Sequence, residues 1–249
     1  MRLLYFGIAG DDVTNWQKVL INSGYFIDLS GVFDGPTHNA TMSWQKERDL
    51  VADGVVGDKT RARIGLGPNN VSVADLNIKF KQAKNYTKAN RTDIRWIVIH
   101  SMEAPEASTT AENVANWFAS PAAPKSSAHF CIDSDSIIQC VLETDIAWHA
   151  QGGNKYGIGL EHSGYARQTR EQWLDSYSQA MLSLSAKLST MLCDKFDLPK
   201  EYVDREGLKA GLKGITTHNE ITKAFNIAGG HYDPGPNFPM DYYIDLVNA

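Results

Sequence analysis

The sequence predicts an α/β layered domain preceded by a small helical unit. Two observations carry this prediction. From Ile94 to Phe196, β-branched apolar segments such as WIVIH (96–100) alternate with helical patterns, and such interleaving is typical of layered α/β domains. In residues 1–66, two Trp-Gln pairs instead begin helical phases that Gly and Asp turns separate.

Composition limits the class of protein. The 249 residues are 43% hydrophobic and 21% charged, as in ordinary globular domains. The formal net charge of −5 argues against a nucleic-acid binder and against binding to anionic membranes through bulk charge. No apolar run reaches the roughly 20 residues of a membrane span, so no membrane insertion is expected.

The N-terminus and the cysteines indicate where the protein is made. The apolar stretch in MRLLYFGIAGDD is shorter than a secretory signal, so we expect a structured first segment. Three cysteines, none in a CxxC pair, are Cys131, Cys140 and Cys193. Their odd number predicts reduced thiols in a protein made in a cytoplasm, and no thiolate zinc cluster.

The first unit contains a weak internal repeat. WQKVL (16–20) and WQKER (44–48) are each associated with a Gly/Asp turn, GVFDGPT (31–37) and ADGVVGDKT (52–60). From the residues alone, a packed helical unit without a site is equally compatible with this pattern. The polar, Gly- and Pro-containing residues 67–90 predict a linker with room for one short helix.

The remaining chain, 91–249, predicts a second domain. Its expected elements are a strand buried on both faces at 96–100, a helix at 111–120, a hairpin over 127–143, a strand at 157–164, and a helix from a capping box at 169–172 to Phe196. Period-two alternation puts Gly159 and Glu161 on one face of their strand.

The loop GGHYDPGPNFP (229–239) holds His231 and Asp233 two positions apart in a backbone restricted by proline. The loop is either a turn with two polar tips or part of a metal site that takes ligands from elsewhere. His100, at the end of a buried strand, is a candidate ligand, although a hydrogen-bonded core histidine fits as well. His218, taken alone, resembles a surface residue.

Six segments in order, WIVIH, SAHF, AWHA, GIGLE, THNE and HYDPGPNFP, resemble the type-2 N-acetylmuramoyl-L-alanine amidases. The likeness runs from about Tyr86 to Asp241. It implies the fold shared with peptidoglycan recognition proteins, a mixed central sheet flanked by helices. Residues 8–66 resemble the peptidoglycan-binding domain-1 family, which implies a three-helix module. Asp34 interrupts a Phe-Gly pair that this second family usually keeps adjacent.

Carried over residue by residue, the amidase resemblance implies that His100, His218 and Asp233 bind Zn²⁺ and leave one position for water. Both imidazoles must be neutral to bind, so activity is expected to fall at acid pH. Glu161 takes the place of the general base in the bacterial branch. Other branches use a Tyr where this chain has Ala128.

His231 stands where many members have Lys. The implied role is to stabilise the oxyanion or protonate the leaving amine; Lys223 is the less favoured substitute. The resemblance also implies a substrate-side group. This group is His129, Trp148, His149 and Asn154. For His129 the alternatives are a residue that supports the metal ligands and a core histidine, for Trp148 and His149 a core tryptophan with an exposed histidine, and for Asn154 a residue that positions the strand of Glu161.

The implied function is zinc-dependent hydrolysis of the amide between N-acetylmuramic acid and L-alanine of peptidoglycan, by a monomer. Two modules with cell-wall chemistry suggest a phage or prophage endolysin, held in the host cytoplasm until release to the cell wall. The alternatives are a non-catalytic peptidoglycan-recognition protein, a bacterial cell-wall remodelling amidase, or cleavage of a bond within the stem peptide by the same zinc.

Overall fold

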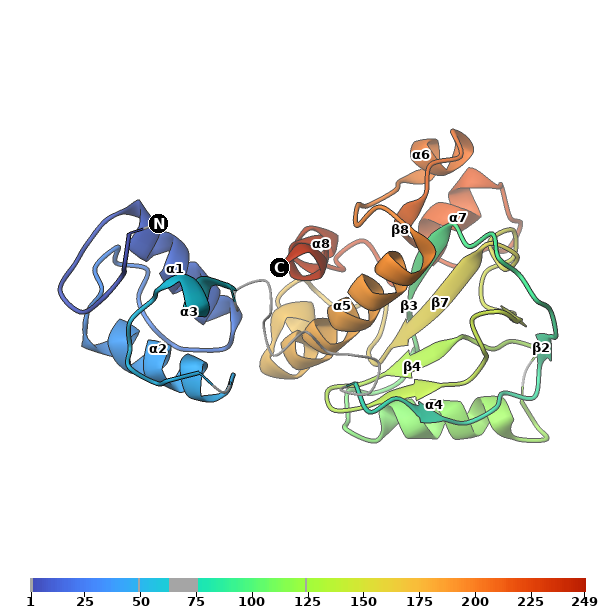
Figure 1. Ribbon diagram of the computed structural model, residues 1–249. Coiled ribbons are helices and arrows are strands. Elements are labelled where there is room, and N and C mark those ends of the chain that lie inside the picture. Colours follow the sequence, from blue (N-terminus) through green and yellow to red (C-terminus); the bar gives the residue numbers. More distant parts are fainter. Residues whose placement is uncertain (1, 49, 63–75, 124) are drawn as a thin grey trace. The chain divides into compact units, whose positions relative to one another are not determined.

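The computed structural model describes residues 2–48, 50–62, 76–123 and 125–249 (Figure 1). The chain divides into two compact units, Met1–Ser72 and Val73–Asn248. Each unit has its own buried apolar core, and each is described by itself below.

The first unit is helical, as predicted. Its described helices are α1 (Asp11–Asn22), α2 (Gly35–Lys46) and α3 (Asp58–Ala62). Trp16 of α1 and Trp44 of α2 pack edge to face, with ring centroids 5.1 Å apart, in the centre of the core. The two Trp-Gln pairs of the sequence therefore supply the aromatic contact that joins the two longer helices.

The sequence repeat is also a repeat of hydrogen bonds. Gln17 and Gln45 are both buried. Each side-chain amide donates to a turn carbonyl and a threonine hydroxyl, and accepts the N–H of the turn glycine. The partners are Gly31, Val32 and Thr37 for Gln17, and Gly54, Val55 and Thr60 for Gln45. Asp34, the departure from the family pattern, caps α2, since its Oδ1 accepts the Thr37 N–H at 2.9 Å.

The second unit is built on a six-stranded mixed sheet with the order β1-β5-β4-β7-β3-β8. The strands are β1 (Lys79–Phe80), β3 (Trp96–Ser101), β4 (Phe130–Ile132), β5 (Ile137–Gln139), β7 (Gly157–His162) and β8 (Gly214–Thr217). The central strand β3 lies between β7 and β8 and is parallel to both, whereas β4 and β5 form the predicted antiparallel hairpin. The predicted α/β class is confirmed.

Helices cover both faces of this sheet. Apolar residues of α4 (Thr110–Ala119) share a cluster with residues of the β4–β5 hairpin. The long helix α5 (Ser176–Phe196) and α8 (Met240–Asn248) lie side by side on the other face (Figure 1). Two short helices, α6 (Arg205–Lys209) and α7 (His218–Ala224), follow β7 and flank β8.

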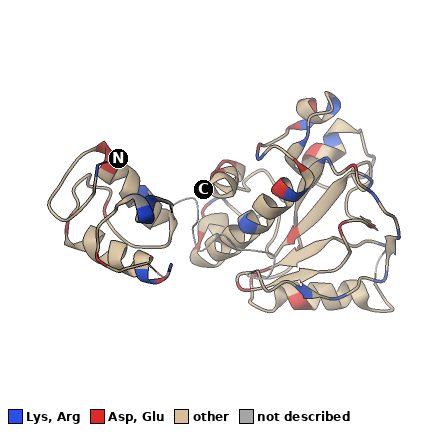
Figure 2. Ribbon diagram, viewed as in Figure 1, with Lys and Arg blue, Asp and Glu red and all other residues tan. Residues whose placement is uncertain are grey.

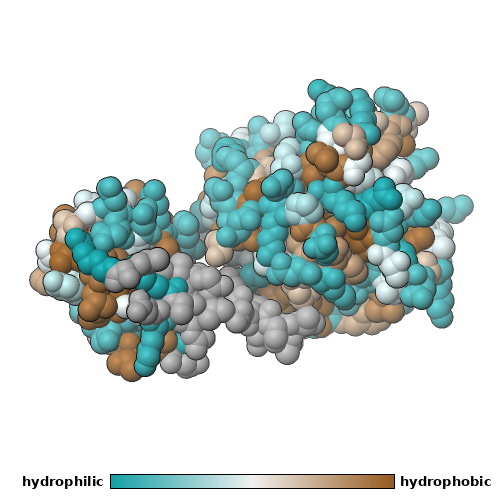
Figure 3. Space-filling view, turned by 45° about the horizontal axis from the view of Figure 1, so that its top comes forward, coloured by the Kyte–Doolittle hydropathy of each residue, from teal (hydrophilic) through white to brown (hydrophobic). Residues whose placement is uncertain are grey.

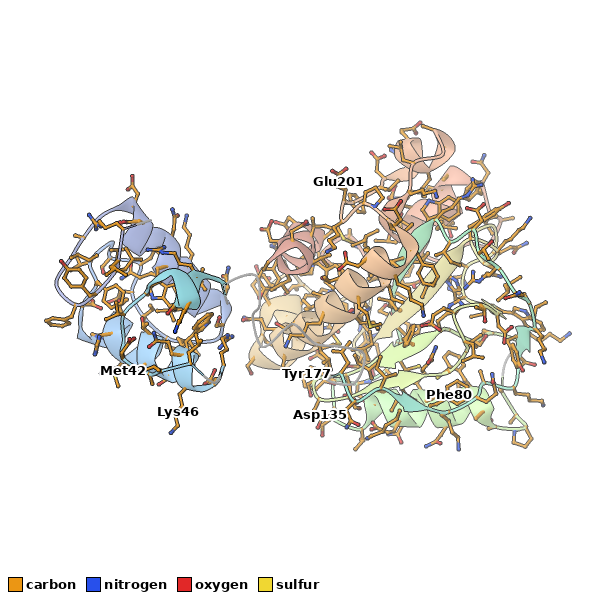
Figure 4. All side chains as sticks on the ribbon, in the orientation of Figure 1. Met42, Lys46, Phe80, Asp135, Tyr177 and Glu201 are labelled. Atoms are coloured by element: carbon orange, nitrogen blue, oxygen red, sulfur yellow. The ribbon has the colours of Figure 1, made fainter. Side chains whose placement is uncertain are left out.

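The predicted helix start at 169–172 is correct in its contacts but not in its extent. Thr169 and Gln172 form the reciprocal bonds of a capping box. They close only the 3-10 turn η1 (Gln172–Leu174). Asp175 then caps α5, which ends at Phe196 as expected. Tyr177 in the first turn of α5 (labelled in Figure 4) donates its hydroxyl to the Ala107 carbonyl.

The segment predicted as a linker differs from the expectation. Its residues 67–75 lie outside the described part of the chain. Residues 76–90 contain no helix and instead join the second unit. There β1 pairs with β5, and β2 (Tyr86–Thr87) pairs with β6 (Ile146–Ala147). A strand of two residues is too short to show a hydrophobic period in the sequence. Its pairing is made by backbone groups, which do not depend on the type of side chain.

The register of the central strands decides which side chains share a face. His100 of β3 is paired with Glu161 of β7, and Val98 with Gly159. The next residue of β7, His162, points the other way and bonds Ser185 of α5. His100 and Glu161 therefore lie side by side on the face of the sheet opposite α5.

The surfaces of both units are mixed. Basic and acidic residues are interspersed along the ribbon (Figure 2), and apolar side chains stand among hydrophilic ones on the visible face (Figure 3). Among the described residues, none of the helices combines the length and the hydrophobicity that a membrane span requires.

Candidate active site

Three buried side chains from three distant segments meet at one end of β3. His100 is the last residue but one of this strand, His218 opens α7, and Asp233 lies in the loop before α8. The Nδ1 atoms of His100 and His218 lie 2.9 and 3.0 Å from the two oxygens of Asp233. One ligand atom from each residue lies within 4.8 Å of the others. Two imidazoles and one carboxylate at this spacing fit a zinc ion.

Local structure explains why these side chains converge. Thr217 ends β8 and caps α7 through its hydroxyl, which accepts the Glu220 N–H at 3.2 Å. His218 is thereby fixed in the first turn. The Asn219 N–H donates to the Asp233 carbonyl at 3.0 Å, which ties the ligand loop to the same turn. The predicted ordering of the 229–239 loop around Asp233 therefore also involves backbone contacts with α7.

The charges at this cluster follow from burial and pairing. Burial alone would raise the pKa of Asp233, but hydrogen bonds and charges from His100 and His218 outweigh it and lower that pKa. Burial lowers the pKa of His100, against the opposing effect of Asp233. An ionised carboxylate beside a neutral imidazole is the protonation state that metal binding requires.

Glu161 stands beside the ligands, and one of its carboxylate oxygens has no partner in the described part of the chain. Its Oε2 atom is buried and has no hydrogen-bond partner among the described residues. Burial, followed by the charge of Asp233, raises its pKa well above the ordinary value. An unpaired buried carboxylate costs free energy unless a ligand uses it. Its position next to the metal cluster is that of a proton acceptor.

These residues line one cavity of about 520 Å³, a size typical of ligand sites. Its lining includes His100, Glu161, His218 and Asp233, and also the half-exposed Trp117 of α4. The cavity therefore combines a metal-type cluster, an unpaired carboxylate and an aromatic wall.

His231 is also at the cavity. Its ring stacks on His218, with centroids 4.7 Å apart and planes 16° apart. Its Nδ1 atom lies 3.8 Å from Asp233, and 71% of its side chain is exposed. Lys223, the considered substitute, does not line this cavity and pairs with Glu220 at 3.7 Å.

The predicted substrate-side group is only partly brought together. Trp148, His149 and Asn154 line the cavity, although Asn154 uses its Oδ1 atom to accept the N–H groups of His149 and Ala150. The role of His129 in substrate binding stays a prediction. This side chain does not line the cavity; it is fully buried, and its Nδ1 accepts the Gly159 N–H at 3.0 Å.

Sequence reasoning missed Arg91. Its guanidinium lies 2.6 Å from Nε2 of His129 and donates to the carbonyls of Glu143, Asn154 and Gly157. Arg91 therefore joins β7 to the segment before β3. Nothing in the sequence around Arg91 distinguishes it from a surface arginine.

The fold is shared with a hydrolase of known structure. The structure is similar to the hydrolase AmiA of Staphylococcus aureus, solved in complex with its ligand, with a TM-score of 0.54 and 18% identity. The match covers 78% of this chain and 90% of that one. At this identity the likeness defines the fold alone.

Sequence comparison then gives the family. Residues 90–236 match the N-acetylmuramoyl-L-alanine amidase family and residues 9–64 a putative peptidoglycan binding domain. The chain is 30% identical over 185 residues to N-acetylmuramoyl-L-alanine amidase A of Achromobacter lyticus. This alignment covers 67% of this chain and 90% of that protein. The chain is also 45% identical over 64 residues to the amidase CwlM of Mycobacterium tuberculosis, 24% of this chain and 16% of CwlM. This chain belongs to the N-acetylmuramoyl-L-alanine amidase family, and both predicted resemblances are confirmed.

Proposed function

We propose that this protein is a zinc-dependent amidase that cuts the bond between N-acetylmuramic acid and L-alanine in peptidoglycan. Family membership assigns the amidase class. One observation supports the metal-dependent reaction: the cluster of His100, His218 and Asp233 stands beside the unpaired carboxylate of Glu161 in one cavity.

The residues of the cluster would hold zinc through two ring nitrogens and a carboxylate oxygen. Bound zinc supplies a Lewis acid that polarises the amide carbonyl and makes the attacking water more acidic. The protein supplies the remaining steps.

Glu161 accepts a proton from water as the water oxygen bonds to the carbonyl carbon of the lactyl group. The carbon–nitrogen bond then breaks, and Glu161 returns the proton to the amine of L-alanine. His231 donates a hydrogen bond to the carbonyl oxygen while negative charge develops there. The products are the glycan with a free lactyl carboxylate and the stem peptide with a free amine.

The first unit would keep the enzyme on its polymer and raise the local substrate concentration. A wall-binding unit joined to an amidase supports an endolysin of a phage or prophage, acting as a monomer. Such an enzyme remains in the host cytoplasm until it is released to the cell wall. A bacterial remodelling amidase would use the same two units and the same chemistry.

The test is mass spectrometry of purified peptidoglycan digested by the full chain, with and without a chelator. We expect free stem peptides that begin at L-alanine, their loss with chelator, and their return with Zn²⁺. Cleavage products that survive complete removal of the metal would refute the zinc mechanism. Intact glycopeptides bound to the protein would indicate a recognition protein, and cuts within the peptide an endopeptidase.

A further inference from the structure

We infer that His149 is a positioning residue: it holds the ring of His100 in place and accepts the Nε2 hydrogen of that ring when Nδ1 of His100 binds the metal. The inference rests on the proposed metal site. His149 belongs to the segment after β6 and lies far from His100 in the sequence. It supplies no ligand atom to the cluster of His100, His218 and Asp233.

The two rings share a hydrogen bond. Nδ1 of His100 faces Asp233 at 2.9 Å, and Nε2 of the same ring lies 3.0 Å from Nδ1 of His149. The rings meet edge to face, with centroids 5.1 Å apart. Both side chains are buried, so water does not compete for this bond.

A neutral imidazole carries its hydrogen on one nitrogen, and the partner of the other nitrogen decides which. When Nδ1 of His100 gives its lone pair to a metal, the hydrogen must be on Nε2. That hydrogen is donated to Nδ1 of His149, which is therefore the acceptor. Partners of this kind orient ligand imidazoles and fix their tautomers in metal sites.

Because Nε2 of His149 has no partner among the described residues, the ring hydrogen of His149 can be on either Nδ1 or Nε2. Its Nε2 atom is buried and has no hydrogen-bond partner in the part of the chain that the structure describes. The tautomer of His149 is thus set through His100. Without metal, Nδ1–H of His100 donates to Asp233, and Nδ1–H of His149 donates to His100. With metal, both rings carry hydrogen on Nε2.

The imidazole of His149 packs against glycine residues of β7. A Cβ atom at Gly159 would lie 2.6 Å from Cγ of His149, and one at Gly157 3.2 Å from its Cε1. At Gly159, any side chain larger than hydrogen would displace the imidazole from His100. Asn154 fixes the backbone at the other side by accepting the His149 N–H at 2.9 Å. Gly159 of the GIGLE segment therefore leaves the space in which His149 contacts His100.

The first experiment needs no substitution. ¹⁵N NMR of the full chain, with labelled histidines, assigns the tautomers of both rings in the metal-free and the Zn²⁺-loaded protein. We expect each ring to change from Nδ1–H to Nε2–H when zinc is added. An unchanged tautomer of His149 in a zinc-binding protein would overturn the inference.

The second experiment measures Zn²⁺ affinity by competition with a chromophoric chelator. His149→Leu removes the acceptor and should weaken affinity by about 10- to 100-fold, the range of such partners. His149→Asn keeps an acceptor oxygen near the place of Nδ1 and should recover most of that loss. Gly159→Ala keeps His149 but displaces its ring, and should resemble His149→Leu. His38→Leu, in the first unit, is the matched control and should bind as the wild type does.

The outcomes separate the two proposals. A wild-type protein that binds no zinc would refute the proposed function itself. Zinc affinity of His149→Leu equal to that of the wild type would refute only the role of His149. Equal losses in the Leu and Asn variants, with lowered thermal stability, would indicate a packing role and also refute it. Should His149→Leu fail to fold, the tautomer measurement still decides.

Discussion

Replacement of Gln45 by leucine tests the hydrogen-bond repeat of the first unit. Gln45 is 1% exposed, and its Oε1 accepts the buried N–H of Gly54 at 2.8 Å. Leucine leaves that N–H without an acceptor, which costs about 1–3 kcal/mol. The Val55 carbonyl keeps a second donor in Thr60, so its loss adds only about 1 kcal/mol. We expect the unfolding free energy of this unit to fall by about 3 kcal/mol.

The repeat supplies the matched control. Gln17 accepts the Gly31 N–H at the same distance, 2.8 Å, but that bond is only partly buried, so Gln17→Leu should cost less, about 1–2 kcal/mol. For a unit of this size a loss of 3 kcal/mol lowers the midpoint by roughly 12–24 °C. Hydrogen exchange of peptides from residues 11–46 and calorimetry of the full chain would measure both variants. A loss below 1 kcal/mol for Gln45→Leu, or the reverse order, would refute the reasoning.

Four further substitutions test the site and one helix cap. Glu161→Gln should keep bound zinc and lose about 10²–10⁴ in kcat; unchanged kcat would show that another group takes the proton. His218→Ala should lose zinc and activity together, and full zinc content by elemental analysis would contradict its role as a ligand. His231→Ala should lower kcat about 10- to 100-fold with zinc retained. This loss is smaller than that expected for removal of a donor shielded from water, because 71% of the His231 side chain is exposed. Asp34→Ala should cost about 1 kcal/mol in urea unfolding of the first unit, since it removes the cap of α2.

The parts of the fold that sequence reasoning found are those that depend on local pattern. The apolar run of β3, the helix that ends before Pro121 and the β4–β5 hairpin all have a period or a turn signal within a few residues. The strands β1 and β2 have neither, because they are defined by pairing with distant segments. A prediction from pattern therefore reads these residues as a linker.

The candidate site divides in the same way. Family motifs bring His100, His218 and Asp233 to notice, and the structure places all three together. A motif does not show which neighbours the side chain of a histidine contacts in the folded protein. His129 and His149 both belong to segments that resemble family motifs, yet one is buried outside the cavity lining and the other bonds His100. This difference depends on tertiary packing, which a single sequence does not reveal.

The length of chain between the ligands has a thermodynamic consequence. His100 and Asp233 are 133 positions apart, so the ligand set is complete only when β3 and the loop before α8 have both reached their final places. The proposed metal would then bind the folded state of the second unit far better than the unfolded chain. At a free zinc concentration 100 times Kd, this preference would add about 2.7 kcal/mol to the stability of that unit. Zinc supply would therefore govern how long the enzyme resists proteases, while the first unit, which has no part in the cluster, keeps its stability unchanged.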